Sequence, residues 1–496
     1  MDLKHIIQFV ASRYPDAYLV GGCVRDRLLG RGSKDFDFVV PQGALELARE
    51  IARRFRGVFV PLDEERDTGR VVFREPEGRF FFVDIARCNG DTLEEDLRRR
   101  DFTINAIAVR ASDWDKPQPE WIDPLGGRED LRRKLIRMAS PTAFRDDPAR
   151  MLRAIRFAAS LGFTIGDETL RQIREDSPLL LRASIERLRD EICYILAQGN
   201  TAQHILLMDE LGLLEQLFPP LGPLKGMMQT YPHHLDGFQH TIETLRQLDW
   251  VLAELSAPSP REGRAAPLHH NLGELKVAIL EHINQKTAGE RNRLVILKLA
   301  TLLHDVGKPA TLSIDERGIT HFYGHEWEGA REAAKAVRRL RFSNQEVEGV
   351  GIIVAHHMRP ALLSREPEVT RRAIYRFFRD TGSWGVEICL LALADHLATW
   401  MEGLTPERWE RRTYVVGMLL EHYFRRKEVI APPPLVRGGE LIKALGLEPG
   451  PIVGKLLEAV REAQAAGEIR TKDEALHLAE KLLRQASTRV GEPPAS

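Results

Sequence analysis

The chain has few cysteines, almost no net charge and no long apolar run over its 496 residues. The four cysteines show no C-x-x-C spacing, which argues against a cysteine-bound zinc ion and favours a reducing compartment. A formal net charge of −1 gives no overall basic signature, so any nucleic acid must be held by local arginine clusters. No apolar stretch approaches membrane-spanning length. We therefore expect a cytoplasmic protein without membrane attachment.

The organisation of the chain changes near residue 112, where mixed strand and helix patterns give way to helical periodicity. A chain of this length exceeds one compact core, so several domains are expected. The predicted fold is an α/β head with a mixed sheet, followed by a predominantly α-helical, multidomain body. The expected parts are a head over 1–112, a neck over 113–165, a helical body over 166–224, a further helical domain over 225–400 and a helical tail over 401–496.

A pair of glycines follows the first apolar strand, in the segment LVGGCVRDRLLG over residues 19–30. Gly21 and Gly22 allow the backbone to turn tightly into a short helix expected over residues 24–29. The first backbone amides of such a helix can bind phosphate oxygens, and Arg25 adds a positive charge beside them. The turn therefore predicts a site for the phosphates of a nucleoside triphosphate.

Two aspartates lie two residues apart on the next expected strand, residues 34–40. Because side chains alternate along a strand, Asp35 and Asp37 share one face. Asp84 supplies a third carboxylate, as the only charged side chain in the apolar run FFFVDIA. Such carboxylates can hold two Mg²⁺ ions, which activate an attacking hydroxyl and stabilise the leaving pyrophosphate. A solvated strand face is the structural alternative for an isolated D-x-D pair, but the surrounding motifs favour a catalytic site.

Two further motifs follow the acidic strands. LRRRDFTINAIA, over residues 97–108, combines clustered arginines for phosphates with Asp101 and Asn105 for hydrogen bonds to a ribose. FRDDPARMLRAIRFAASLGF, over residues 144–163, is an expected helix with Arg150, Arg153 and Arg156 on one face. The structural alternative for the first motif is a solvated helix turn.

The start of the second motif allows two interpretations. Asp147 precedes Pro148, the arrangement of an N-cap followed by proline at the first helical position. Asp147 and Arg150 also form an acceptor and a donor three residues apart, which together present a planar hydrogen-bonding edge like that of a nucleobase. Both interpretations can hold, and whether Asp146 or Asp147 caps the helix stays open.

The ordered motifs GG-x-VRD…D-x-D, RRDFTINA and DDPARMLRAIRF resemble those of class II tRNA nucleotidyltransferases and bacterial poly(A) polymerases over residues 17–220. The resemblance implies a polymerase-beta-like head in which Asp35 and Asp37 bind the catalytic metals. It implies a tRNA substrate and the selection of CTP or ATP by side chains without a nucleic-acid template. The implied nucleotide-binding residues are Gly21, Gly22, Arg25, Arg100, Asp101, Asn105, Asp147, Arg150, Arg153 and Arg156. One departure is Asp146, where the family usually has glutamate.

A second departure is the short segment between the third acidic strand and the RRDFTINA motif, where only RCNGDTLEED intervenes. Family members that complete the whole CCA end usually carry a longer flexible loop there, which would help the pocket change from C to A recognition. The short segment resembles the subgroup that adds two cytidines and leaves the A to a separate A-adding enzyme. We therefore expect CC addition, with complete CCA addition as the alternative.

A second group of ligand-type residues lies within predicted helices far from the head. Imidazoles suit transition metals, and an aspartate can bridge two ions that activate water against a phosphoester. The order of these residues resembles the HD phosphohydrolase domain, which implies a core site of His240, His304, Asp305 and Asp395. It implies a second group that offers another metal position or a phosphate contact, made of Lys308, His325, His356 and His357.

The HD resemblance implies phosphatase or 2',3'-cyclic phosphodiesterase activity on RNA ends, with Mn²⁺, Ni²⁺ or Co²⁺ as the metal. A retained fold without activity is the alternative. Arginines over residues 171–189 suit a surface that follows RNA phosphates, although a charged solvent face fits them equally well. Two rival functions remain for the whole chain: a bacterial poly(A) polymerase, and an HD phosphohydrolase whose head only binds RNA. The oligomeric state stays open, a homodimer included.

Overall fold

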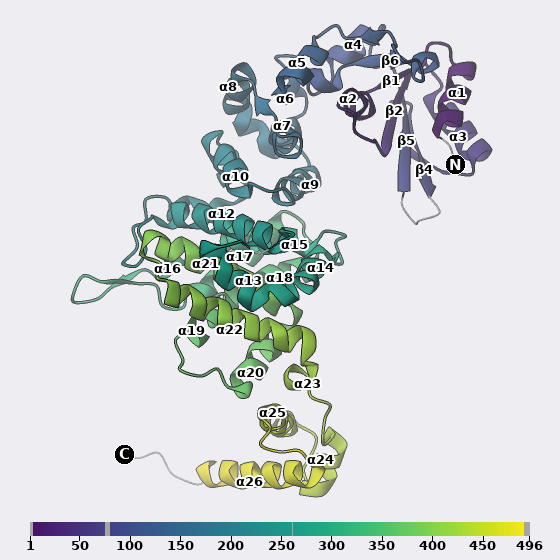
Figure 1. Ribbon diagram of the computed structural model, residues 1–496. Helices are drawn as coiled ribbons and strands as arrows, with labels where there is room; N and C mark the ends of the chain where they lie inside the picture. Colours follow the sequence, from purple (N-terminus) through teal and green to yellow (C-terminus); the bar gives the residue numbers. More distant parts are fainter. Residues whose placement is uncertain (1–2, 75–79, 260, 491–496) are drawn as a thin grey trace. The chain divides into compact units, whose positions relative to one another are not determined.

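The computed structural model describes residues 3–74, 80–259 and 261–490. The chain forms two compact units (Figure 1): one comprises the residues up to Gln198 together with Leu207–Gln216, the other Gly199–Leu206 and the residues from Leu217 onward. Parts of the expected head (1, 2 and 75–79) and the end of the expected tail (491–496) lie outside the described residues. Within the described ranges, none of the helices combines the length and the apolar character needed to span a bilayer.

The first unit contains a mixed sheet with strand order β3-β4-β5-β2-β1-β6-β7. β2 and β5 pair in parallel, and the other neighbouring strands are antiparallel. The strands are β1 (Tyr18–Val20), β2 (Asp35–Val40), β3 (Val58–Asp63), β4 (Thr68–Arg74), β5 (Phe80–Arg87), β6 (Ala108–Arg110) and β7 (Trp121–Ile122). The predicted α/β head is confirmed, but its sheet extends past residue 112, because β7 pairs with β6.

Helices surround this sheet and then dominate the first unit. They are α1 (Leu3–Arg13), α2 (Gly22–Leu28), α3 (Ala44–Phe55), α4 (Leu93–Arg98), α5 (Gly127–Arg133), α6 (Ala143–Asp146), α7 (Ala149–Leu161), α8 (Asp167–Asp176), α9 (Ile185–Leu196) and, with residues in both units, α10 (Thr201–Glu210) and α11 (Leu214–Leu217). A short parallel pair, β8 (Leu135–Ile136) and β9 (Thr164–Ile165), interrupts them. The predicted apolar stripe of α7 is buried at Met151, Leu152 and Ile155, and α7 packs against α9.

The second unit is a helical assembly. Its helices are α12 (Gly237–Ser256), α13 (Ala266–Leu272), α14 (Lys276–Asn284), α15 (Arg293–Leu303), α16 (Lys308–Thr311), α17 (His325–Arg339), α18 (Asn344–His356), α19 (Arg359–Leu363), α20 (Arg371–Thr381), α21 (Gly385–Trp400), α22 (Pro406–Arg425), α23 (Lys427–Ile430), α24 (Gly438–Leu445), α25 (Pro451–Ala466) and α26 (Lys472–Val490). A two-stranded ribbon, β10 (Ser313–Ile314) and β11 (Thr320–His321), joins α16 to α17. α21 is apolar on almost every face and packs against α12, α15, α18 and α22, as a central helix does.

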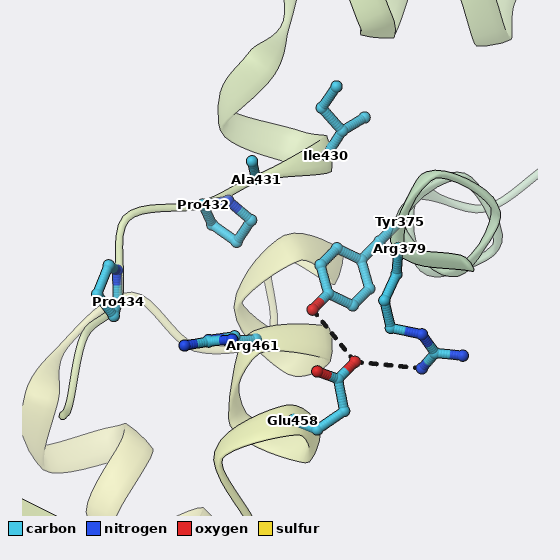
Figure 2. Close-up of a pocket in the computed structure, with 8 residues that line it drawn as sticks. All are labelled: Tyr375, Arg379, Ile430, Ala431, Pro432, Pro434, Glu458 and Arg461. Atoms are coloured by element: carbon cyan, nitrogen blue, oxygen red, sulfur yellow. Dashed lines mark hydrogen bonds and ion pairs between the residues drawn. The ribbon is translucent and has the colours of Figure 1, made fainter. Parts of the chain in front are cut away.

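The C-terminal helices form a small core of their own and meet α20 through charged groups. Val453, Leu456 and Val460 of α25 belong to this core. Figure 2 shows part of the contact with α20, where the Tyr375 hydroxyl and Arg379 Nη1 each donate to Glu458 Oε1 at 3.2 Å. Exposed ion pairs contribute little individually, so the apolar core accounts for the folding of the tail.

Candidate active sites

The glycine turn after β1 lies directly against the D-x-D strand. Gly21 has a φ of +74°, in the left-handed region that glycine adopts without strain. A Cβ placed on Gly21 would lie 2.9 Å from Asp37 Oδ2 and 3.2 Å from Arg100 Nη1. The missing side chain at position 21 therefore lets the turn approach the second carboxylate. The expected helix begins at Gly22, two residues earlier than predicted.

Asp35 and Asp37 share a strand face, while Phe36 and Phe38 between and after them are buried. Burial raises the pKa of Asp37 to about 6, Arg100 opposes this shift, and the carboxylates of Asp84 and Asp35 add to it. The pKa of Asp35 is raised as well, chiefly by burial. Two carboxylates whose ionised forms are disfavoured by burial and mutual repulsion fit a divalent cation, which would neutralise both.

Asp84 has a different partner from the one expected of a third metal ligand. Arg70 Nε and Nη2 donate to its two oxygens, each at 2.7 Å. The register of β5 explains this, since Asp84 lies opposite Arg70 on β4 and opposite Asp37 on β2. Asp84 therefore lies beside the D-x-D pair as predicted, but its oxygens are held by an arginine that the sequence did not single out.

The RRDFTINA motif is joined to the glycine turn by hydrogen bonds. Arg25 Nη1 donates to Asn105 Oδ1 at 2.9 Å, and Asn105 Nδ2 donates to Asp101 Oδ1 at 3.0 Å. Arg153 Nε of α7 donates to the other oxygen of Asp101 at 2.5 Å. Burial alone would raise the pKa of Asp101, but Arg153 and Asn105 outweigh it and lower that pKa. Three motifs that are separate in sequence thus form one continuous polar network.

Two more nucleotide-site arginines bind protein groups in this network. Arg100 donates to Asp96 Oδ2 from Nε at 3.2 Å and from Nη2 at 3.0 Å. Arg156 Nε lies 2.8 Å from Glu191 Oε2 of α9. Asp96 and Glu191 were not predicted, because acidic residues on helices have no distinctive sequence signal.

The predicted base-reading edge is closed in this structure. Arg187 donates to both oxygens of Asp147, at 3.0 and 2.6 Å. Arg150 Nη2 donates to the carbonyl of Arg99 at 3.0 Å, and its Nε lies 3.7 Å from Asp147 Oδ2. Asp147 Oδ1 also accepts from the amide of Ala149 at 3.2 Å, but the N-cap of α7 is Pro148, one residue after the predicted cap. Asp147 therefore bonds the first turn of α7 from just outside the helix, and Arg187 occupies the edge that the sequence predicted to face a base.

The connection from β5 to α4 is short, and hydrogen bonds hold it in place. The amide of Asn89 donates to Asp96 Oδ1 at 3.0 Å, and the amide of Asp91 donates to Glu95 Oε2 at 2.8 Å. Thr92 caps α4 by accepting from the amide of Glu95 at 3.3 Å. A segment held in this way has little freedom to change shape.

A second polar site lies inside the helical unit and is centred on Asp305. Its Oδ2 lies 3.3 Å from His304 Nε2 and 3.6 Å from His240 Nε2. Its Oδ1 lies 3.6 Å from His325 Nε2 and 4.0 Å from His357 Nε2. The ligand-type atoms form two groups, each within 4.8 Å, which share Asp305. One carboxylate is therefore placed to bridge two metal positions.

The histidines of this cluster are oriented by the backbone. The Nδ1 atoms of His304, His325 and His357 donate to the carbonyls three residues before them, at 2.8, 2.8 and 2.7 Å. Because a carbonyl can only accept, Nδ1 carries the proton in each neutral ring and Nε2 is left to face Asp305. Histidines that bind metal ions usually donate their other ring N–H to a carbonyl or carboxylate in this way. The donor set therefore fits a transition metal.

Two of the predicted residues are placed differently. His356 does not join the cluster: its ring packs edge-on against Trp327 at 5.3 Å, because successive helical residues point in different directions. Lys308 is buried, and its Nζ donates to Asp305 Oδ2 and Gln229 Oε1, both at 2.6 Å, instead of facing outward toward a phosphate. Asp395 is close as expected, with its Oδ1 3.0 Å from His240 Nε2.

His233 lies beside the cluster and was not predicted. Its ring packs edge-on against His240 with the centroids 4.9 Å apart, and its buried Nδ1 has no hydrogen-bond partner among the described residues. Burial lowers its pKa to about 3. The sequence feature that could have indicated His233 is the histidine pair in the segment TYPHH.

A glycine turn against two strand carboxylates is the arrangement of a nucleotidyltransferase head, and the separate group of histidines around Asp305 is that of an HD domain. The chain is 34% identical over 467 residues to the A-adding tRNA nucleotidyltransferase of Deinococcus radiodurans, covering 93% of this chain and 94% of that protein. It is also 34% identical over 472 residues to the CC-adding tRNA nucleotidyltransferase of Thermus thermophilus, covering 93% and 92%. The chain belongs to the tRNA nucleotidyltransferase family and is an enzyme.

Family models match along the chain in the order of its parts. They are the poly A polymerase head domain over residues 17–137, the "Probable RNA and SrmB- binding site of polymerase A" over 162–223, the HD domain over 237–400 and a tRNA nucleotidyltransferase domain 2 over 327–479. A solved CCA-adding enzyme in complex with ATP shares the fold, with a TM-score of 0.62 at 23% identity, covering 98% of this chain and 95% of that one.

Replacing Gly21 with alanine is expected to lower the rate of nucleotide addition by about 100-fold, since the new Cβ displaces the Asp37 carboxylate. The measurement is kcat for incorporation of labelled CTP or ATP into tRNA. Gly30→Ala is the matched control, because Gly30 has a φ of +67° but nothing within 4 Å of an added Cβ. Equal losses in the two variants would show that backbone strain, and not the approach to Asp37, accounts for the effect.

Proposed function

We propose that the head adds two cytidines to the 3' end of tRNA and leaves the terminal A to a separate enzyme. The 3'-hydroxyl of the RNA attacks the α-phosphorus of CTP, a new P–O bond forms, and the bond to the pyrophosphate leaving group breaks. Asp35 and Asp37 would hold Mg²⁺, which would activate the hydroxyl and stabilise the charge on the leaving group. Asp84 would act through Arg70, whose guanidinium it orients toward the D-x-D strand.

The nucleotide would be held by the network that joins the motifs. Gly21, Gly22 and Arg25 would contact the triphosphate, and Arg100, Asp101 and Asn105 the ribose and phosphates. Asp147 and Arg150 would select the base once Arg187 releases Asp147. Arg153 would hold this selecting helix against the head through Asp101, and Arg156 would hold it against α9 through Glu191.

The proposal of CC addition rests on the connection between β5 and α4, which is short and held by hydrogen bonds. Five residues separate the two elements, from Cys88 to Thr92. The amides of Asn89 and Asp91 in this segment donate to the side chains of Asp96 and Glu95 in α4. This connection contains no longer segment that could move. A pocket shaped to recognise one base therefore has nothing at this position that would reshape it to recognise another base.

Addition of A alone is a second candidate, because a fixed pocket is also compatible with one purine and an A-adding relative is as similar as a CC-adding one. The assay uses three RNA substrates: tRNA without CCA, tRNA ending in CC, and an unstructured RNA. We expect CTP to extend the first by two residues and ATP to extend none of them. Extension of the CC-ending tRNA by one A, without extension of the first substrate by CTP, would establish the second candidate. Both activities together would establish complete CCA addition, and long tails on the unstructured RNA would indicate a poly(A) polymerase.

We propose further that the HD site is a metal-dependent phosphohydrolase that acts on RNA ends, on a terminal phosphate or a 2',3'-cyclic phosphate. The support is the arrangement of four histidines around Asp305, which fits Mn²⁺, Ni²⁺ or Co²⁺. Bound there, such metals would supply an activated water for attack on phosphorus. Lys308 would stay paired with Asp305 and keep this carboxylate ionised.

We propose the domain boundaries expected from the sequence, with one change. The head would extend to residue 122, so that it includes β7. The neck would then run to 165, the RNA-binding body over 166–224, the HD domain over 225–400 and the tail from 401 onward. The arginines of the body would contact the tRNA backbone.

A further inference from the structure

A cationic cavity of about 410 Å³ lies between α19, α21 and α22. It is separate from the Asp305 cluster, although α21 contributes to both. Its charged lining consists of four arginines and one glutamate, namely Arg365, Arg408, Arg411, Arg412 and Glu407. The volume falls within the range of small-molecule pockets. The excess of positive charge points to an anionic ligand.

Two buried nitrogen atoms at this cavity have no hydrogen-bond partner among the described residues. Arg412 is 7% exposed; its Nη1 donates to the carbonyl of Ala392 at 3.1 Å, and its buried Nε is unbonded within the described part of the chain. His396 is also 7% exposed, and its Nε2 is equally unbonded there. A buried polar nitrogen without a partner is unfavourable, and more so when it is charged. A ligand with acceptor oxygens would pair with Arg412 Nε, and with His396 Nε2 in the neutral tautomer that carries its proton there.

The neighbouring charged groups do not compensate Arg412. Arg365 is exposed and forms no ion pair among the residues described, and Glu407 likewise pairs with none of the four arginines. Asp395 lies on the same helix as His396, but its Oδ1 is engaged by His240 and Thr399. Burial lowers the pKa of Arg412 to about 10, Asp395 opposes the shift, and Arg365 adds to it.

The other two arginines have structural partners. Arg408 lies over the ring of Trp400 at 3.7 Å, and Arg411 Nη2 donates to the carbonyl of Pro367 at 3.2 Å. They therefore shape the cavity and add to its positive potential, while Arg365, Arg412 and His396 remain available as donors.

We propose that this cavity binds a small phosphate-bearing anion, either inorganic phosphate or the phosphate of a mononucleotide, through Arg365, Arg412 and His396. A phosphate group offers several acceptor oxygens, which matches guanidinium donors. The ligand is small because two of its three donors are buried: a free phosphate or a terminal phosphate can enter the cavity, whereas the backbone of an RNA strand follows an exposed groove.

The test is isothermal titration of the full-length protein with inorganic phosphate, and separately with CMP, in EDTA so that metal-dependent binding at the head and the HD site does not contribute. Arg365→Gln is expected to weaken phosphate binding about tenfold or more, since a charge-assisted hydrogen bond is lost. Glu407→Gln is expected to tighten it about threefold, because a negative charge in the lining of the cavity is removed. Both side chains are exposed, so neither change disturbs the core.

Effects of opposite sign in these two variants, with nucleotide addition unchanged in both, support the proposal. Tighter binding of CMP than of phosphate identifies a mononucleotide as the ligand, and equal binding identifies free phosphate. No binding at millimolar phosphate, or equal affinity in wild type and Arg365→Gln, overturns it. Binding of a single-stranded RNA oligonucleotide that depends on Arg365, without binding of phosphate, also overturns it in favour of an RNA contact.

Discussion

Asp37→Asn is expected to lower kcat for nucleotide addition by about three orders of magnitude or more. The substitution keeps the size of the side chain but removes a negative charge that would hold a catalytic metal, and metal ions at such sites contribute several kcal/mol of transition-state stabilisation. Asp37 is the carboxylate against which the glycine turn packs, with Oδ2 2.9 Å from the Cβ position of Gly21. The measurement is single-turnover incorporation of CTP into tRNA lacking its CCA end.

The thermal stability of the metal-free protein should not fall in Asp37→Asn, because burial and the carboxylates of Asp84 and Asp35 already disfavour the ionised form, whose pKa is raised to about 6. Asp63→Asn is the control, since Asp63 is a carboxylate at the end of strand β3 that accepts from the amide of Arg66 and lies outside the site. Hydrolysis at the HD site should be unchanged in both variants. Retention of more than about a tenth of the activity in Asp37→Asn would remove Asp37 from the reaction.

The head was largely predictable because its decisive features are local in sequence. Each of these features indicates a single element: the glycines before a helix, the alternation of Asp35 and Phe36 on a strand, and the single acidic residue in an apolar run. The structure places the strands where these patterns predicted them, as β1, β2 and β5. The parallel pairing of β2 with β5 then brings Asp37 opposite Asp84, which order along the chain had suggested.

The partners of the predicted residues were not predictable in the same way. Arg70 bonds Asp84 because β4 is antiparallel to β5 in one particular register, and a register cannot be read from a single strand. Arg187 bonds Asp147 across 40 positions, where α9 packs beside α7. Arginines are common, and only the tertiary structure shows which two of them bond the predicted carboxylates.

In the helical unit as well, the local sequence features were predictable, whereas the contacts of individual side chains were not. The order of histidines and aspartates was visible, because the pair His304-Asp305 ends an apolar helix. The pair His356-His357 offered no means of choosing between its members, since both stand at the end of α18. His357 is 2% exposed and faces Asp305, whereas His356 packs against Trp327. One step of about 100° around a helix decides which of the two belongs to the cluster.

Because His357 faces Asp305 and His356 does not, we expect replacements of these two residues to have different effects. His357→Ala is expected to lower metal-dependent release of phosphate from a 2',3'-cyclic nucleotide by about 100-fold or more, because it removes an imidazole whose Nε2 faces the shared carboxylate. His356→Ala should retain the activity of the wild type. The assay uses Mn²⁺, Ni²⁺ and Co²⁺ in turn, and the metal content of each purified variant is measured by mass spectrometry, which reports on the site even where turnover is slow.

His356 provides a matched control for the position of His357 in the site. Both substitutions remove an imidazole at the end of α18, so a general effect on that helix would appear in both variants. His357→Gln keeps more of the side-chain volume and should lose hydrolysis and bound metal as His357→Ala does, which separates loss of a ligand from loss of packing. Nucleotide addition should be unchanged in all three variants. Equal hydrolysis and equal metal content in His356→Ala and His357→Ala would refute the assignment of Asp305 and its histidines as the catalytic metal centre.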